Sequence, residues 1–236
     1  MITQNSYLRP HGIHTFSLPA WAGRLPDGRT YNTCPAAGVC AAVCYARHGT
    51  YRFPAVLAKH QRNLARVLDD LPQWEADMRA ELAHPKYRDG AALRVHDSGD
   101  YFSDAYVFAW LRVARAVPDV LFYSYTKEVD RFKQLVEPDP PDNFKWVYSY
   151  GGKQDHLIDP DTDRVADVFP SETAIAEAGW NSNAATDLAA VLGPAPVGMT
   201  QNNQSHLRRK IGQRTFREWQ AADTARRRIT RATDHR

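Results

Sequence analysis

The fold of this chain is decided by residues 91–125, which read AALRVHDSGDYFSDAYVFAWLRVARAVPDVLFYSY. Ala91–His96 is an apolar stretch of strand length that ends in an Asp/Gly turn. Ser103 is a suitable N-cap for a helix over Asp104–Ala116. Val120–Tyr125 is rich in β-branched and aromatic residues and predicts the next strand. Strand, helix and strand in this order indicate two parallel strands joined by a right-handed crossover.

The same alternation continues on both sides of this unit. Residues 1–28 are rich in proline, glycine and isolated aromatics, and we expect an irregular lead-in there. Five or six such units fit either an incomplete (β/α) barrel or an open doubly wound sheet, and no glycine-rich phosphate motif follows any strand. We therefore predict an α/β fold, an incomplete barrel of parallel strands. Further strands are expected at Arg29–Thr33, Phe144–Tyr150, Arg164–Phe169 and Ala195–Met199, and further helices from Pro54 and at Pro72–Leu82, Val129–Val136, Ser171–Ala178 and Ala184–Leu192.

Composition places the chain among ordinary globular proteins. It has 236 residues, of which 43% are hydrophobic and 24% charged. This balance excludes wholesale disorder. No apolar run is long enough for a membrane span, and the N-terminus lacks the pattern of a secretory signal. We expect a protein of the cytoplasm without a membrane partner, and the sequence does not indicate its oligomeric state.

The net charge of +3 hides a basic C-terminal segment. Residues 208–236 hold ten Lys/Arg and three Asp/Glu, so they carry +7 and leave −4 on the rest. A basic helix is expected over Ser205–Thr230, and we divide the chain into a domain at 1–204 and a helical extension at 205–236. Cations interleaved with Phe216 and Trp219 could bind nucleic acid, or the helix could simply be solvated and docked on the acidic body.

The three cysteines of the chain lie within eleven residues, as Cys34-Pro-Ala-Ala-Gly-Val-Cys40-Ala-Ala-Val-Cys44. An odd number of cysteines in a reducing compartment argues against a disulfide framework. The small apolar residues between them would let the backbone wrap an inorganic core. Three thiolates on a [4Fe–4S] cluster leave one iron open to a small molecule. His48 extends the spacing to a Cys3His pattern, so a zinc site is the alternative, and three inert buried cysteines are a third.

Polar residues cluster where the predicted strands end, which is where barrel enzymes place their chemistry. His96, Asp97, Ser98, Gly99 and Asp100 follow one strand. As catalytic candidates we take Asp97 and Asp100, together with a lysine after the next strand that could bind an anion or form a Schiff base. This lysine is Lys127. The cofactor-binding candidates are the other three residues of the turn, the aromatic Tyr125, and a glycine pair that a ligand could approach closely, Gly151 and Gly152.

Several of these blocks together resemble a known family. Residues 16–21 (FSLPAW), the cysteine loop ending Cys44-Tyr-Ala, residues 96–103 (HDSGDYFS) and Tyr125-Thr-Lys127 are similar to the actinobacteriophage gene-product-88 domain family, over about residues 15–200. The resemblance implies a bacteriophage protein acting in the host cytoplasm, and it brings no settled activity.

At one remove, the layout is similar to radical S-adenosylmethionine enzymes, which carry three cysteines after the first strand of a partial barrel and an aromatic beside the last cysteine. Tyr45 stands in that place here, and Ser98-Gly99-Asp100 stands after the strand Ala91–His96, where those enzymes have a glycine-rich turn. That superfamily spaces its cysteines C-x3-C-x2-C, whereas the loop here is three residues longer.

These observations lead to one main hypothesis. The chain holds a [4Fe–4S] cluster on Cys34, Cys40 and Cys44, with the open iron facing a pocket at the strand ends. If the protein is an enzyme, the iron would act as a Lewis acid or, by the second resemblance, on S-adenosylmethionine. The alternatives are a cluster-containing protein that binds nucleic acid or senses redox state, and a Cys3His zinc protein.

Overall fold

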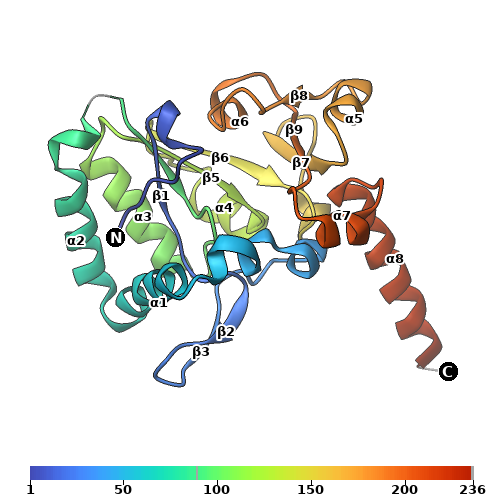
Figure 1. Cartoon of the computed structure of the whole chain (residues 1–236), viewed down its shortest axis with the longest axis horizontal. Coiled ribbons are helices and arrows are strands. Elements are labelled where there is room, and N and C mark those ends of the chain that lie inside the picture. Colours follow the sequence, from blue (N-terminus) through green and yellow to red (C-terminus); the bar gives the residue numbers. More distant parts are fainter. Residues whose placement is uncertain (89, 235–236) are drawn as a thin grey trace.

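Seven parallel strands form the central sheet of the computed structural model, which describes residues 1–88 and 90–234 (Figure 1). Every pair of neighbouring strands in this sheet is parallel. The order across the sheet is β1 (Ile13–Phe16), β4 (Ala92–Val95), β5 (Leu121–Thr126), β6 (Phe144–Ser149), β7 (Val165–Phe169), β9 (Val197–Thr200) and β8 (Asn181–Ser182).

Strands that follow one another in the chain mostly lie next to one another in this sheet. From β4 to β7 the order never reverses, which is the arrangement of a barrel and not of a doubly wound sheet. Within the described residues β1 and β8 are the two edges, so the barrel is not closed. The predicted incomplete (β/α) barrel is confirmed.

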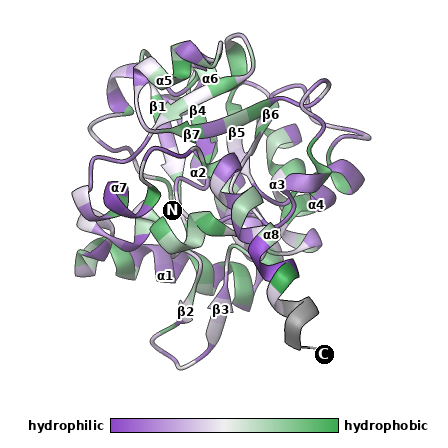
Figure 2. Ribbon diagram, turned by 90° about the vertical axis from the view of Figure 1, so that its right-hand side faces the viewer, coloured by the Kyte–Doolittle hydropathy of each residue, from purple (hydrophilic) through white to green (hydrophobic). Residues whose placement is uncertain are grey.

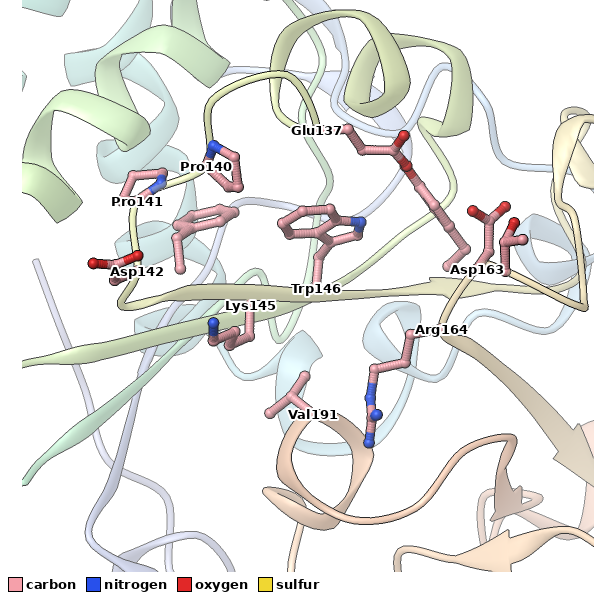
Figure 3. A pocket seen from close by; sticks show the side chains of 12 residues that line it. Glu137, Pro140, Pro141, Asp142, Lys145, Trp146, Asp163, Arg164 and Val191 are labelled. Carbon is pink, nitrogen blue, oxygen red and sulfur yellow. The ribbon is translucent and has the colours of Figure 1, made fainter.

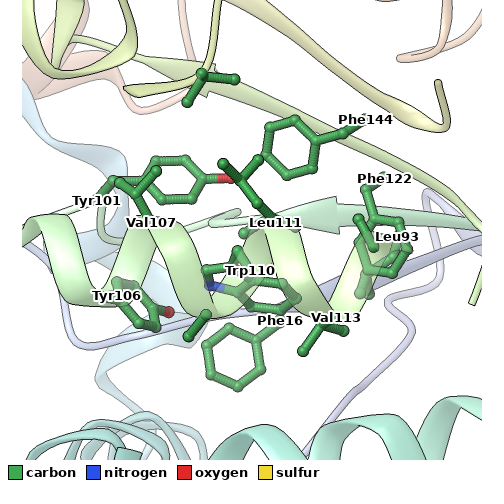
Figure 4. Packing of buried hydrophobic residues seen from close by; sticks show 14 of the residues in the cluster. Phe16, Leu93, Tyr101, Tyr106, Val107, Trp110, Leu111, Val113, Phe122 and Phe144 are labelled. Atoms are coloured by element: carbon green, nitrogen blue, oxygen red, sulfur yellow. The ribbon is translucent and has the colours of Figure 1, made fainter. Parts of the chain in front are cut away.

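The first four α-helices are α1 (Pro54–Asp69), α2 (Leu71–Leu82), α3 (Asp104–Ala116) and α4 (Val129–Leu135). Asp70 and Ser103 cap α2 and α3 by accepting from backbone N–H groups of the first turn. Trp110 of α3 is fully buried and packs edge-to-face on Phe16 of β1 (Figure 4). It packs in the same way on Trp74 of α2. This aromatic layer fixes the helices against the outer face of the sheet.

The opposite, concave face of the sheet is filled over only part of its length. The short helix α6 (Ala189–Leu192) packs Ala190 and Val191 on side chains from the inner face, among them Tyr123 and Val147. At the carboxyl ends of the strands a cavity remains. The remaining helices are α5 (Glu172–Glu177), α7 (Ser205–Ile211), α8 (Phe216–Asp234) and the 3-10 turns η1 (Arg9–His11), η2 (Val39–Val43), η3 (Tyr45–Arg47), η4 (Gly49–Arg52), η5 (Pro85–Tyr87) and η6 (Asp155–Leu157).

Four expectations for individual segments need correction. The lead-in is not wholly irregular, because it supplies the edge strand β1. The strand expected at Arg29–Thr33 exists as β3 (Thr30–Asn32), but it pairs antiparallel with β2 (Ala22–Arg24) in a separate hairpin. The single C-terminal helix is two helices, since Gly212, with a φ of +70°, ends α7. The helix expected over Ala184–Leu192 forms only its last turn, as α6.

Among the described residues, no helix is both long and apolar enough to cross a membrane.

Candidate functional site

A cavity of about 850 Å³ opens at the carboxyl ends of the strands. This size lies within the range of small-molecule sites. The three cysteines line it together with most of the residues predicted from the strand ends. From the predicted set the lining holds Cys34, Cys40, Cys44, His96, Asp97, Ser98, Gly99, Asp100, Tyr125 and Lys127.

The cysteine loop is held in shape by partners from three distant segments. The backbone N–H of Ala36 donates to the carboxylate of Glu128 at 2.8 Å, and that of Val39 donates to the side-chain oxygen of Gln220 in α8 at 2.8 Å. The N–H groups of Gly38 and Cys40 both donate to the carbonyl of Gly151, each at 3.2 Å. The loop is therefore ordered by the fold itself, and the small residues between the cysteines allow these close approaches.

Gly151 and Gly152 are not among the residues that line the cavity, and they serve the cysteine loop instead. Gly152 forms a β-bridge with Ala37. Gly151 has φ +98°, and a side chain there would meet Phe216 of α8 at 2.9 Å. Only glycine fits this conformation without strain. The pair therefore supports the loop that carries the cysteines, and its predicted role in cofactor binding stays a prediction.

All three cysteines are free thiols, and each residue is partly exposed. Burial of the sulfur raises the pKa of each thiol, that of Cys44 to about 11. Reactive cysteines have lowered pKa values, so this environment does not suit a nucleophile at neutral pH. A metal ion or cluster supplies the positive charge that a thiolate needs in such a place.

His48 does not join the cysteines. Its Nδ1 lies 3.3 Å from Nε2 of His206 in α7, near the surface. Within residues 1–88 and 90–234, no three His, Cys, Asp or Glu side chains gather where a single metal ion could bind. This finding supports neither the Cys3His zinc alternative nor the predicted cluster, and both stay predictions. In a cubane cluster each thiolate binds a different iron, so its cysteines lie farther apart than the ligands of one ion.

His96 is buried and held in an unusual backbone conformation. Its φ is +65°, which is uncommon outside glycine. Nε2 pairs with the hydroxyl of Tyr106 at 2.9 Å, while Nδ1 has no protein partner. Burial lowers the pKa of His96 to about 3, so the ring is neutral at physiological pH. The hydroxyl of Ser98 is likewise buried without a protein partner. Both residues line the cavity.

Asp97 links the turn after β4 to the segment after the cysteines. The hydroxyl of Tyr45 donates to the Asp97 main-chain carbonyl at 2.6 Å, and the hydroxyl of Tyr51 donates to its carboxylate. Nη1 of Arg94 lies 3.4 Å from Oδ1 of the same carboxylate. The aromatic beside Cys44 is thus used to fix the cysteine segment to β4.

Asp100 joins three segments through its carboxylate and its backbone N–H. Oδ1 accepts from the N–H of Tyr101 and the hydroxyl of Thr126, each at 2.8 Å, and Oδ2 accepts from the N–H of Lys127 at 2.9 Å. Its own N–H donates to the carbonyl of Thr33, next to Cys34, at 2.8 Å. Burial raises the pKa of Asp100. These contacts assign it a positioning role between β4, β5 and the cysteine loop, and its predicted catalytic role stays a prediction.

Lys127 places its ammonium group at the end of β6. Nζ donates to the carbonyl and hydroxyl of Ser149 at 2.9 and 3.0 Å and to the carbonyl of Tyr150 at 2.7 Å. All three acceptors are neutral, so the charge is not cancelled by these direct contacts. All three N–H donors of the ammonium are used in these contacts, and the predicted role of Lys127 in catalysis or anion binding stays a prediction.

A buried ion pair on the cavity wall escaped the sequence analysis. Asp187, just before α6, accepts from Arg94 at 3.1 Å, from the Tyr123 hydroxyl at 2.7 Å and from the Tyr125 hydroxyl at 2.8 Å. The guanidinium of Arg94 lies 4.9 Å from the centre of the Tyr125 ring, and its Nε has no protein partner. The feature of the sequence that could have indicated this ion pair is the presence of Arg94 inside the otherwise apolar strand Ala91–His96. Nothing local marks Asp187 as its partner, 93 residues away.

The C-terminal helices cover the cysteine loop. Leu207 and Ile211 of α7 pack on Val43 of the loop. The carboxylate of Asp167 in β7 accepts from the N–H groups of Phe216 and Arg217 and thereby caps α8. Burial raises the pKa of Asp167 to about 6. The predicted division at residue 204 is still a prediction, but the beginning of the extension contributes directly to the surroundings of the cysteines.

A second hollow, of about 480 Å³, lies along β6 (Figure 3). Its walls include Glu137, Trp146 and Arg164, and none of the predicted site residues lines it. The Arg164 side chain is bonded to the carbonyls of Ala190 and Gly193. We take the cysteine-lined cavity as the candidate site because the chemically capable side chains gather there.

Comparison with known proteins agrees with the resemblance seen in the sequence. The gene product 88 family matches residues 2–231. The chain belongs to the gene product 88 family. It is 38% identical over 109 residues to the Gene 88 protein of Mycobacterium phage L5, which covers 44% of this chain and 46% of the phage protein. It is 35% identical over 109 residues to the Gene 88 protein of Mycobacterium phage D29, covering 44% and 45%.

The match with these curated relatives spans somewhat less than half of their length. Both relatives come from bacteriophages, in agreement with the expected phage origin of this gene product 88 protein. No solved structure matches the chain. The distant resemblance to radical S-adenosylmethionine enzymes gains no support from these comparisons.

Proposed function

We propose that this gene product 88 protein holds a [4Fe–4S] cluster on Cys34, Cys40 and Cys44, with one iron open to a small ligand in the same cavity. The observation that carries the proposal is the placement of all three cysteines on the wall of one cavity at the strand ends. The loop that bears them is fixed by three segments, and the thiols form no disulfide. A fourth ligand of the cluster cannot be a cysteine of this chain, since the chain has only these three.

Such a cluster, when bound, would supply electrons or a Lewis-acidic iron. The residues of the chain would position the ligand beside it. Lys127 uses its three N–H donors on neutral protein acceptors, so it would contribute positive charge near the ligand, which suits an anionic group. The Arg94 Nε–H has no protein partner and could donate a hydrogen bond to the ligand, and the Ser98 hydroxyl could donate or accept one. These groups lie on the wall of the same cavity and together favour a small, oxygen-bearing, negatively charged ligand.

Metal and sulfide analysis of protein purified without oxygen tests the proposal. We expect about four irons and four labile sulfides per chain, with a brown colour. Cys40→Ser should remove most of the iron. His48→Ala is the matched control, because a cluster on three cysteines does not use this residue while a Cys3His site does. One zinc per chain with no sulfide, lost on His48→Ala, would refute the cluster.

A second measurement separates the two chemistries expected of an open iron. The electron paramagnetic resonance spectrum of the reduced protein is recorded with and without S-adenosylmethionine. Because the cysteine loop is three residues longer than in radical S-adenosylmethionine enzymes, we expect no spectral change and no 5′-deoxyadenosine. A change in the spectrum together with product release would assign the radical chemistry instead.

The location proposed for the protein is the host cytoplasm, where reducing conditions preserve cysteine-bound clusters. This proposal rests on the phage relatives and on the chemistry of the loop.

A further inference from the structure

Two long segments of the chain contain no acidic residue. Residues 28–68 and residues 188–217 have no Asp or Glu, although the chain holds 27 of these residues in total. The first segment contains the cysteine loop, η4 and most of α1, and the second contains α7. Each carries several cations. They are Arg29, Arg47, Arg52, Lys59, Arg62 and Arg66 in the first and Arg208, Arg209, Lys210, Arg214 and Arg217 in the second.

The fold brings these two segments together. Nδ1 of His48, next to η4, lies 3.3 Å from Nε2 of His206 in α7. The ammonium group of Lys210 donates to the carbonyl of Ala42 at 3.0 Å. Figure 1 shows α7 beside the segment between the cysteines and α1. The result is one positively charged surface built from parts of the chain that are about 160 residues apart, next to the mouth of the cavity.

Most cations of the two segments face solvent, although Lys59 is half-buried and Arg29 pairs with Asp27 and Asp69. Arg52 of η4 and Arg209 and Lys210 of α7 are all exposed. Over the part of the chain that the structure describes, no cation of α7 forms an ion pair with a carboxylate. Figure 2 shows α7 as a mostly hydrophilic helix. These exposed cations contribute little to the stability of the free protein, and the surface they form is complementary to a polyanion.

Helix α8 extends the charged surface away from the body of the protein (Figure 1). Residues 225–230 are exposed throughout. Arg226, Arg227 and Arg228 are consecutive, and successive residues of a helix point about 100° apart. The three cations therefore face three sides of an exposed helix. A flat surface, such as a membrane, can contact only one of these sides, whereas a groove with phosphates on both walls can contact all of them.

We propose that α7, η4 and the exposed part of α8 form a sequence-independent binding surface for double-stranded DNA, with α8 in the major groove. The major groove of B-form DNA admits a helix, and its two walls are lined by phosphates. The A-form duplex of RNA has a deep and narrow major groove that does not admit one. In the free protein, Asp223 holds Arg226 at 2.7 Å and Arg227 at 2.5 Å, and phosphates would replace this carboxylate as their partner. This inference does not depend on the cluster.

Fluorescence anisotropy with the intact protein and a labelled 30-base-pair DNA duplex of mixed sequence tests the proposal. We expect binding at about 50 mM salt that weakens steeply toward 200 mM, because each neutralised phosphate releases counterions. Each phosphate that a variant no longer neutralises should lower the slope of log K against log salt by about 0.9 and the affinity at 0.1 M salt by about eightfold. R226Q/R227Q/R228Q should therefore bind at least about tenfold more weakly, with unchanged iron content.

The matched control removes three exposed cations from the opposite end of the strands. R9Q/K86Q/R88Q changes η1 and η5 and the residue after it, which lie before β1 and β4. This variant should bind DNA within about twofold of the unaltered protein, because longer-range charge is screened over about 10 Å. An equal loss in both variants, an RNA duplex bound as tightly as DNA, or binding to phosphatidylserine vesicles but not to DNA would each overturn the proposal.

Discussion

Replacement of Asp187 by alanine is expected to be the most destabilising change of a polar residue at the candidate site. The Asp187 carboxylate is buried and balances the charge of Arg94 at 3.1 Å. It also accepts from the hydroxyls of Tyr123 and Tyr125 at 2.7 and 2.8 Å. Among the described residues, Asp187→Ala leaves the guanidinium with Asp97, at 3.4 Å, as its carboxylate partner, and it leaves both hydroxyls without this acceptor.

The magnitude follows from the cost of an unpaired buried charge. Removing one partner of a buried ion pair costs about 3–5 kcal/mol. The free energy of unfolding should therefore fall by about 4 kcal/mol, and the melting temperature by about 8–16 °C at roughly 2–4 °C per kcal/mol for a chain of this size. Asp187→Asn keeps one acceptor oxygen and the shape of the side chain, so its cost should be smaller.

Urea unfolding followed by tryptophan fluorescence measures this cost, since the chain has six tryptophans. Asp223→Ala is the matched control, because it also removes a carboxylate that pairs with arginine, but its partners are 76% and 71% exposed. That variant should lose no more than about 1 kcal/mol. A cost below about 1 kcal/mol for Asp187→Ala would refute the reasoning, since it would mean that water replaces the carboxylate at the cavity wall.

Two further predictions concern the junction between the cysteine loop and α8. Gly151→Ala should lower the free energy of unfolding by about 1–3 kcal/mol, because φ is +98° and the new Cβ would lie 2.9 Å from the Phe216 ring. Thermal unfolding measures this loss, and an unchanged melting temperature would contradict the prediction. Burial raises the pKa of Asp167 to about 6 in the folded protein, so protonation of this carboxyl stabilises the fold. The stabilisation, up to about 3 kcal/mol, is present below about pH 4 and is lost as the pH rises from about 4 to 6. In urea unfolding at several pH values, Asp167→Asn should show a flatter profile than the unaltered protein over this window, and parallel profiles would exclude Asp167 as the titrating group.

Local patterns in the sequence were sufficient for the elements and the class of fold. The helix expected at Asp104–Ala116 forms with these bounds, because a capping serine and a helical repeat of apolar residues act within a few residues of one another. The strand predicted at Phe144–Tyr150 forms over Phe144–Ser149. Since parallel strands of a partial barrel end on one side, the shared location of Cys34, Asp100 and Lys127 also followed from the order of elements.

Only the tertiary structure decided the partners of these residues. Arg94 and Asp187 are 93 positions apart, and no local pattern pairs them. The strand expected at Arg29–Thr33 has a suitable local sequence, yet the longer-range pairing of β1 with β4 gives the edge of the sheet to residues 13–16. Gly151 accepts hydrogen bonds from the cysteine loop, which no local pattern indicates. Hydrogen bonds and charges act over a few ångströms in space, whatever the separation in sequence, so this part of the site is determined by the packing of distant segments.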